Sequence, residues 1–260
     1  MNSSFALVAI QAALQAGELL KKGFGSPGPI SSKKGRHDLV TMHDKASETM
    51  IKSCITQAFP DHTFLAEESG ISQGKNTSVT WVIDPLDGTV NFAHGIPYFC
   101  ISIAVLVNNI VVAAIIHMPM TGELFVAEKG KGAFLNGSLL SVSTTKDPKD
   151  AFLATDIPYN AEENPGGCID SFSKIMLLGT PVRRIGSAAS ALAYVAAGKL
   201  DGYWEISLQP WDVAAGLLLI EEAGGKVSHY DGSPHTLAPS STIIASNTHL
   251  HPWMIEQMKP

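Results

Sequence analysis

The sequence predicts an α+β first half followed by an α/β second half. Three patterns support this division: short apolar runs that end in acidic residues before position 90, two apolar runs around an Asn pair at 108–109, and alternating strand and helix patterns after position 150. A polar segment at 143–150 separates the halves. We therefore expect an N-terminal lobe over residues 1–146 and a C-terminal lobe over residues 147–260.

The first half begins with two helical patterns. Apolar side chains recur at helical spacing over 5–22, and a second pattern over 44–59 ends at Pro60, which places Asp44 near a helix N-terminus. Between them, a Pro/Gly/Ser stretch leads into a basic run at 31–36, which we expect to form a mobile loop.

Strands are predicted for the rest of the first half. The runs 63–66 and 79–83 lead directly into acidic residues, so their C-terminal ends should bring carboxylates to one sheet edge. The runs 101–107 and 110–117 predict a β-hairpin, because an Asn–Asn pair tolerates the left-handed conformation of a tight turn. Further short strands are expected at 122–127 and 132–135, in an antiparallel sheet.

The second half alternates between the two kinds of element. The predicted strands are 151–155, 181–185 and 202–206, and the predicted helices are 168–178, 187–198 and 211–223. The last of these helices would carry Asp212 in its first turn.

Composition favours a globular protein of the cytoplasm. The formal charge of −6 over 260 residues disfavours general electrostatic binding to nucleic acid. Three cysteines stand far apart without a CxxC spacing, as expected of reduced thiols, and the N-terminus lacks the basic residues of a secretory signal. The most apolar region, 101–116, is interrupted by the Asn pair and is too short on either side to span a bilayer.

The segment 81–92, WVIDPLDGTVNF, is the most informative. It puts Asp84 and Asp87 three residues apart at a strand end, with the Leu86 carbonyl between them, and oxygen ligands of this kind suit magnesium. The N–H groups of Gly88 and Thr89 would then open a helix and offer a seat for phosphate. Taken alone, the segment could equally be an ordinary turn with solvated carboxylates.

Two other acidic blocks favour a metal site over an ordinary turn. Glu67 and Glu68 end the earlier apolar run, and Asp212 stands in the block WDVAAG near a predicted helix start. Alone, the first would be a solvated surface pair and the second a helix cap. Together, the blocks AEES at 66–69, WVIDPLDGTVNFAHGIP at 81–97 and WDVAAG at 211–216 resemble the inositol monophosphatase family over nearly the whole chain. The resemblance implies a layered αβαβα sandwich.

The resemblance also implies a set of magnesium ligands. Glu67, Asp84 and the Leu86 carbonyl would hold one ion, and Asp84, Asp87 and Asp212 a second, with a third and weaker ion near Glu67. The chemistry implied is two-metal phosphoryl transfer, in which water attacks the phosphorus without a covalent enzyme intermediate.

The catalytic roles implied by the resemblance fall on residues around these ligands. Glu67 and Thr89 would orient the attacking water, Asp44 would accept a hydrogen bond from the Thr89 hydroxyl, and the amides of Gly88 and Thr89 would hold phosphate oxygens. Lys33 matches a loop lysine that approaches the metals when the loop closes, although it could equally be a solvated charge.

Substrate recognition is implied at the other side of the site. Glu205 would accept hydrogen bonds from inositol hydroxyls and the backbone of Ala188 would contact the ring, while Asp87 and Asp212 would contribute to substrate binding. The segment Val90–Phe92 favours the inositol monophosphate branch, but Gln209 replaces a His common in animal members, which leaves the fine specificity open.

The expected activity is magnesium-dependent hydrolysis of inositol 1-phosphate and related monophosphates. The alternatives are fructose-1,6-bisphosphatase or another sugar-phosphate phosphatase, or an additional role in transcription antitermination or with RNA, since the pair Arg183–Arg184 resembles that of bacterial relatives. Lithium sensitivity and a homodimer are further implications of the resemblance.

Overall fold

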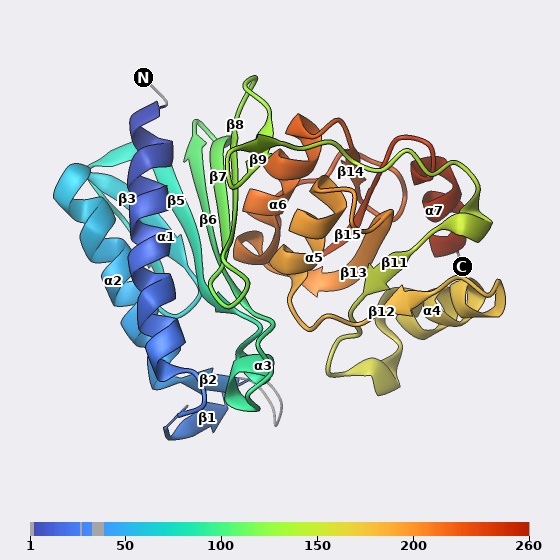
Figure 1. Cartoon of the computed structure of the whole chain (residues 1–260), viewed down its shortest axis with the longest axis horizontal. Helices are drawn as coiled ribbons and strands as arrows, with labels where there is room; N and C mark the ends of the chain where they lie inside the picture. The colour runs from blue at the N-terminus through green and yellow to red at the C-terminus, as the bar shows by residue number, and fades with distance from the viewer. Residues whose placement is uncertain (1–2, 27, 33–38, 260) are drawn as a thin grey trace.

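The computed structural model describes residues 3–26, 28–32 and 39–259. These residues form five layers: two helices, an eight-stranded sheet, two central helices, a five-stranded sheet and two outer helices (Figure 1). The predicted αβαβα sandwich is confirmed.

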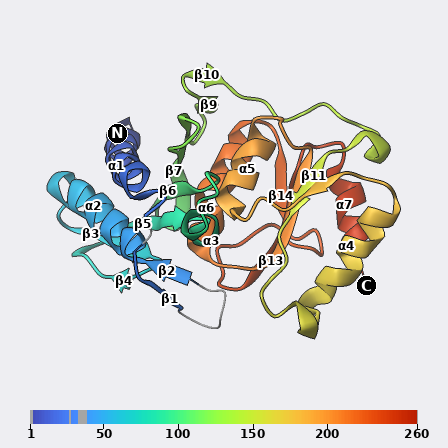
Figure 2. The ribbon, with the colours of Figure 1, turned by 60° about the horizontal axis from the view of Figure 1, so that its bottom comes forward.

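The first layer consists of α1 (Ser3–Gly23) and α2 (Met42–Ala58), which lie side by side on the outer face of the large sheet (Figures 1 and 2). The face of α1 toward the sheet is rich in buried alanine, so the helix approaches the strands closely. Helix α2 begins at a capping box formed by Thr41 and Asp44, as the sequence predicts for Asp44.

The large sheet has the order β10-β9-β8-β7-β6-β5-β3-β4. Its strands are β3 (His62–Ala66), β4 (Gly70–Ser72), β5 (Asn76–Asp87), β6 (Cys100–Val107), β7 (Ile110–Met118), β8 (Glu123–Glu128), β9 (Ala133–Leu135) and β10 (Ser138–Leu139). The predicted hairpin is confirmed, since Asn108 and Asn109 join β6 to β7 with φ of +50° and +63°. The antiparallel prediction is wrong for one pair: β3 runs parallel to β5, because the edge strand β4 returns the chain between them.

Strand β5 extends to Asp87, through the segment for which an ordinary turn was the alternative interpretation. Asp84 pairs with Ser102 and Asp87 pairs with Cys100, so three steps on β5 match two steps on β6. Residues three apart in a regular strand point to opposite faces, but one extra residue in a β-bulge brings them to the same face. The bulge therefore explains how both aspartates can serve one site.

The smaller sheet has the order β12-β11-β13-β15-β14. Its strands are β11 (Leu153–Thr155), β12 (Val182–Arg183), β13 (Gly202–Leu208), β14 (Lys226–Ser228) and β15 (Ser241–Ser246). The predicted alternation holds as far as helix α6 (Pro210–Glu222), but the chain after 223 adds β14, β15 and a last helix. Strand β15 enters the sheet antiparallel to β13.

Helices α5 (Ala188–Ala196) and α6 (Pro210–Glu222) lie between the sheets, whereas α4 (Cys168–Leu177) and α7 (His251–Met258) cover the far side (Figure 1). The remaining elements are β1 (Ile30–Ser32), β2 (Leu39–Thr41), α3 (Thr89–Ala93) and the short 3₁₀ helices Pro148–Asp150, Ala161–Glu163 and Pro165–Gly167. Of the expected basic loop at 31–36, Ser31 and Ser32 belong to strand β1, which pairs with β2, and positions 33–36 lie outside the described residues.

One buried apolar cluster includes residues from both sides of position 146, among them Ala114, Leu192, Leu218 and Ile243. The division into lobes at 146/147 stays a prediction. Among the residues described, no helix has the length and apolar character needed to cross a membrane.

Candidate active site

The predicted site residues meet at one cavity of about 830 Å³, where the ends of β3, β5 and β13 face the starts of α5 and α6. Its lining includes Glu67, Asp84, Leu86, Asp87, Gly88, Thr89, Ala188, Glu205 and Asp212. Asp44 lies just behind this lining, and Lys33 falls outside the described residues. Segments more than 140 residues apart in the sequence thus build one acidic pocket.

Asp84 is the most deeply placed acid of the pocket, with 2% of its surface exposed. Its Oδ1 accepts a hydrogen bond of 3.0 Å from the Leu86 amide. Burial raises the pKa of Asp84 well above its usual value, and the nearby carboxyl groups of Glu67, Asp87 and Asp212 raise it further. The charged groups that act most strongly on Asp84 are all acids, so Asp84 is the kind of group that binds a proton or a metal ion.

Asp87 joins the two halves of the chain. Its Oδ2 accepts hydrogen bonds of 2.7 Å from the Ser187 hydroxyl and 2.7 Å from the Ala189 amide at the start of α5. Burial raises the pKa of Asp87 to about 6, although these two hydrogen bonds act to lower it. All of these bonds use one oxygen, and Oδ1 is left for the pocket.

Gly88 and Thr89 turn the chain from β5 into α3. Gly88 has φ of +97°, and a Cβ there would come within 3.0 Å of the Tyr98 carbonyl oxygen, so only glycine fits. The amide of Thr89 belongs to the first turn of α3, where N–H groups have no acceptor within the helix. The predicted helix start beside the two aspartates is therefore confirmed, although α3 is only five residues long.

Asp44 is fully buried and uses both carboxyl oxygens. Oδ2 accepts from the Thr41 amide at 2.7 Å and from the Thr41 hydroxyl at 2.6 Å, while Oδ1 accepts from the Thr89 hydroxyl at 2.9 Å. The Thr89 oxygen also lies 3.0 Å from the Leu86 carbonyl oxygen. The predicted contact between Asp44 and Thr89 is thus present.

Asp212 stands in the first turn of α6 and caps it, since its Oδ2 accepts from the Gln209 amide at 2.7 Å. The sequence left Asp212 as either a helix cap or a metal ligand. The two interpretations are compatible, because Asp212 caps α6 and still lines the pocket. Glu67 follows β3, and its amide continues the ladder to the Ile83 carbonyl at 3.1 Å.

Glu205 on β13 also lines the pocket and accepts a hydrogen bond from the buried Tyr203 hydroxyl. Burial raises the pKa of Glu205 well above its usual value, Asp156 raises it further and the Tyr203 hydrogen bond lowers it. Ala188 is nearby in the lining, at the first position of α5.

Sequence reasoning missed Asp156, which also lines the pocket. Its carboxylate accepts from the Gly186 amide at 3.0 Å and lies 3.4 Å from Nε of Arg184, and burial raises its pKa. The signal was available, because Asp156 directly follows β11 just as Glu67 follows β3. Two polar residues of α2, Ser47 and Glu48, were also missed, because an isolated helix pattern does not reveal which segments it will contact.

The carboxylates do not already stand as a metal site. Within the described ranges, no three His, Cys, Asp or Glu side chains take positions that could hold a metal ion. The acids are instead engaged with protein donors, and the carboxyl groups of Glu67 and Asp84 contact each other. The donor set, however, consists of carboxylate and carbonyl oxygens, which is what a hard divalent cation prefers. Magnesium therefore fits the chemistry of the pocket once the side chains reorient.

Comparisons with known proteins agree with the fold. A model of the inositol monophosphatase family matches residues 1–260. The chain is 43% identical over 253 residues to Nus factor SuhB of Escherichia coli, covering 97% of this chain and 94% of that protein. It is 40% identical over 253 residues to an inositol-1-monophosphatase of Caulobacter vibrioides, covering 96% and 99%. The crystal structure of extragenic suppressor protein suhB from Bartonella henselae matches with a TM-score of 0.94 at 38% identity, covering 98% of both chains.

Proposed function

Since this chain belongs to the inositol monophosphatase family, we propose that it is a magnesium-dependent phosphomonoesterase that hydrolyses inositol 1-phosphate and related monophosphates. The observation that carries the proposal is the pocket that joins Glu67, Asp84, Asp87 and Asp212 to the start of α3. Four convergent acids would serve no purpose in binding an anionic ester unless cations reversed the charge.

The proposed metal ligands are Glu67, Asp84, the Leu86 carbonyl, Asp87 and Asp212. Two magnesium ions, with a third and weaker one near Glu67, would supply Lewis-acid charge neutralisation at the phosphate. The raised pKa of Asp84 supports this assignment, because its causes, burial and neighbouring acids, are those that a bound cation would offset.

Thr89 and Asp44 would control the direction of the attacking water. The Thr89 hydroxyl has one proton, and donating it to Asp44 Oδ1 turns the lone pairs of Thr89 toward the pocket, where they can accept from water. The Leu86 carbonyl oxygen is then free of this proton. Glu67 would accept the second proton of the same water, and water itself displaces the alcohol, so no covalent intermediate is required.

The phosphate group would bind at the turn between β5 and α3. The amides of Gly88 and Thr89, at the start of α3, would donate to phosphate oxygens where negative charge increases during the reaction, as in an oxyanion hole. The left-handed conformation of Gly88 supports this role, because it directs the chain so that two successive amides begin the helix.

The alcohol would leave toward the Glu205 end of the pocket. Glu205 would accept hydrogen bonds from inositol hydroxyls, the Ala188 backbone would contact the ring, and Asp87 and Asp212 would lie near the leaving oxygen. Fructose 1,6-bisphosphate and other sugar phosphates are alternative substrates, since a carboxylate facing a polar cavity recognises hydroxyl groups in general.

A direct assay tests the proposal. Release of phosphate from inositol 1-phosphate, fructose 1,6-bisphosphate and nucleotide monophosphates is measured with MgCl₂ and with EDTA, for the wild type and for Asp84→Asn. We expect metal-dependent turnover, highest on inositol 1-phosphate, and none in the variant. Asp150→Asn, which changes an exposed acid outside the pocket, is the matched control. Equal turnover in EDTA would refute the metal role.

A second role is favoured by the relative named Nus factor SuhB. We propose that the chain can also join a transcription antitermination complex or bind RNA, independently of catalysis. The test is co-purification of RNA polymerase and RNA with the Asp84→Asn variant from the native cell. If the inactive variant retains RNA polymerase or RNA, the second role is supported. If it retains neither, phosphatase activity is the only role that remains proposed.

Three further properties belong to the same proposal. A homodimer is tested by sedimentation velocity, and lithium sensitivity by adding LiCl to the phosphatase assay. A cytoplasmic location is supported by the three cysteines, Cys54, Cys100 and Cys168, which are all free thiols. Fractionation of the native cell tests it.

A further inference from the structure

Three polar side chains on one face of α2 are buried in the fold. Asp44, Ser47 and Glu48 are 0%, 0% and 4% exposed and lie on the same helix face as the core residues Ile51 and Ile55. Buried polar side chains need hydrogen-bond partners, so the partners of these three residues show which segments this face of α2 holds in place. Asp44 contacts Thr89, as described above, and the other two residues contact the two strand ends that carry the proposed metal ligands.

Ser47 contacts the bulge of β5. Its hydroxyl donates a hydrogen bond of 2.7 Å to the Pro85 carbonyl oxygen. Pro85 stands between Asp84 and Leu86, at the point where the register of β5 against β6 shifts. A bulge interrupts the ladder that would otherwise fix the backbone, so this bond from α2 holds the segment that presents both ligands.

Glu48 contacts the end of β3. Its Oε2 accepts a hydrogen bond of 2.9 Å from the Glu68 amide, directly after Glu67. A charged acceptor makes this bond stronger than a neutral one. One turn along the helix, Nζ of Lys52 lies 2.9 Å from Ser69 Oγ and 3.1 Å from Ser72 Oγ, so the turn after Glu67 is joined to α2 twice.

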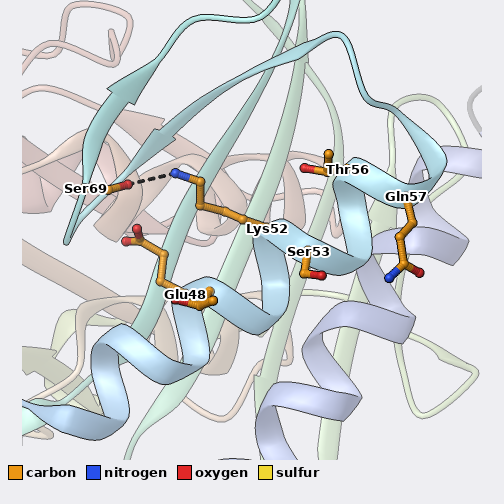
Figure 3. Close-up of a pocket in the computed structure, with 7 residues that line it drawn as sticks. Glu48, Lys52, Ser53, Thr56, Gln57 and Ser69 are labelled. Atoms are coloured by element: carbon orange, nitrogen blue, oxygen red, sulfur yellow. Dashed lines mark hydrogen bonds between the residues drawn. The ribbon is translucent and has the colours of Figure 1, made fainter.

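Figure 3 shows Glu48 and Lys52 pointing from α2 toward Ser69, at the edge of a surface hollow of about 550 Å³. The acidic pocket lies elsewhere, and Glu48 is not among the residues that line it. Glu48 therefore acts on the pocket only through the backbone.

We propose that Ser47 and Glu48 are positioning residues for the metal site, which set its magnesium affinity by fixing the strand ends of Asp84 and Glu67 to one rigid helix. The inference rests on the proposed function, since it concerns the same ligands. Each holds the backbone beside a proposed metal ligand, Ser47 at Pro85 and Glu48 at Glu68. If the backbone that carries Glu67 and Asp84 were mobile, Mg²⁺ binding would have to order that backbone. The affinity for Mg²⁺ would then be lower.

The test measures Mg²⁺ binding by calorimetry and by the rise in unfolding temperature between EDTA and increasing MgCl₂, both without substrate. Glu48→Met keeps the length of the side chain and removes the acceptor, and we expect roughly a tenfold loss of Mg²⁺ affinity. Ser47→Ala removes the donor to Pro85, and we expect a loss of about two- to tenfold. Glu48→Gln retains an acceptor oxygen and should stay closer to the wild type than Glu48→Met.

Thr49→Ala is the matched control on the same helix, because the Thr49 hydroxyl donates only to the Lys45 carbonyl, at 2.8 Å, and should leave Mg²⁺ affinity unchanged. Variants that unfold at lower temperature in EDTA but bind Mg²⁺ like the wild type would show a structural role only and overturn the proposal. If Glu48→Met does not fold, Ser47→Ala decides the proposal by the same measurement. A wild type that binds no Mg²⁺ would instead refute the proposed function.

Discussion

The Thr89 hydroxyl donates a hydrogen bond of 2.9 Å to Oδ1 of Asp44, a residue 45 positions earlier in the chain. The other carboxyl oxygen of Asp44 accepts two bonds from Thr41, one from its amide and one from its hydroxyl. Asp44 is therefore oriented from one side by the start of α2 and orients Thr89 on the other. This arrangement makes the direction of a single hydroxyl proton depend on a fully buried carboxylate.

Asp44→Asn separates this orienting role from metal binding. The amide can accept through only one atom, so it cannot serve both Thr41 and Thr89 as the carboxylate does. We expect kcat to fall about 10- to 100-fold, with little change in the Mg²⁺ concentration at half-maximal rate. Steady-state assays at several MgCl₂ concentrations measure both quantities. A large loss of Mg²⁺ affinity would mean that Asp44 supports a metal ligand directly.

Asp84→Asn should have the opposite profile. Removing the acid at the centre of the cluster should lower activity on the order of 10³-fold or more and abolish stabilisation by Mg²⁺, which for the wild type would be about 2.7 kcal/mol at 100 times Kd. In EDTA the variant should unfold at a temperature equal to or above that of the wild type, because a buried charge surrounded by acids is gone. Thermal unfolding with and without MgCl₂ measures this. Normal Mg²⁺-dependent turnover in the variant would refute the assignment.

Much of the fold could be predicted because its elements are local patterns. The Asn108–Asn109 hairpin, the start of α2 at Asp44 and the start of α6 near Asp212 follow from turn and capping chemistry within a few residues. The parallel pairing of β3 with β5 and the antiparallel entry of β15 could not, since strand direction depends on which distant strands become neighbours.

The candidate site shows the same limit. The spacing of Asp84 and Asp87 indicated a shared ligand role, but the physical reason is a bulge whose register is set by β6 rather than an ordinary turn. The contacts of Ser47 and Glu48 were equally out of reach, because a buried polar residue on a helix reveals its partner only when the helix is packed.

Gly88→Ala tests the turn that presents the phosphate amides. Gly88 and Gly95 both have positive φ, of +97° and +73°, but only at Gly88 would a Cβ meet backbone atoms, while at Gly95 nothing lies within 4 Å. We expect Gly95→Ala to cost about 1 kcal/mol of unfolding free energy and Gly88→Ala about 3 kcal/mol or more. Urea unfolding measures the difference. Phosphatase activity should fall sharply in Gly88→Ala alone, and equal effects of the two variants would contradict the close approach of Tyr98.

Tyr203→Phe tests how Glu205 is oriented. The Tyr203 hydroxyl donates to the Glu205 carboxylate, and the Tyr203 side chain is fully buried. Removing the hydroxyl should therefore let the carboxylate rotate without changing the shape of the pocket. We expect KM for inositol 1-phosphate to rise several-fold, on the order of one lost hydrogen bond, with kcat little changed. For 4-nitrophenyl phosphate, whose leaving group offers no hydroxyl to Glu205, KM should stay at the wild-type value. A parallel rise for both esters would mean that Tyr203 supports the pocket in general.

We expect His251 to make the stability of the protein depend on pH in the acid range. The side chain is 5% exposed at the start of α7, with Nδ1 at 2.8 Å from Ser246 Oγ and Nε2 at 3.0 Å from Ser228 Oγ. Burial lowers the pKa of His251 to about 4, whereas an unfolded histidine titrates near 6.5. Between these values the unfolded chain binds a proton that the folded chain does not, so the contribution to stability is complete above pH 6.5 and is lost as the pH falls toward 4. The loss is about 2 kcal/mol between pH 7.5 and pH 5.

His251→Gln should remove this pH dependence, because glutamine does not titrate and can still bond to a serine hydroxyl. Urea unfolding at pH 7.5 and pH 5 measures it: the wild type should lose about 2 kcal/mol more than the variant over this interval, whatever the two stabilities are at pH 7.5. The comparison also isolates His251 from His235, whose pKa burial likewise lowers to about 4 and which both proteins retain. Equal losses in the two proteins would place the acid sensitivity elsewhere, because the only titratable group that differs between them is the imidazole between Ser228 and Ser246.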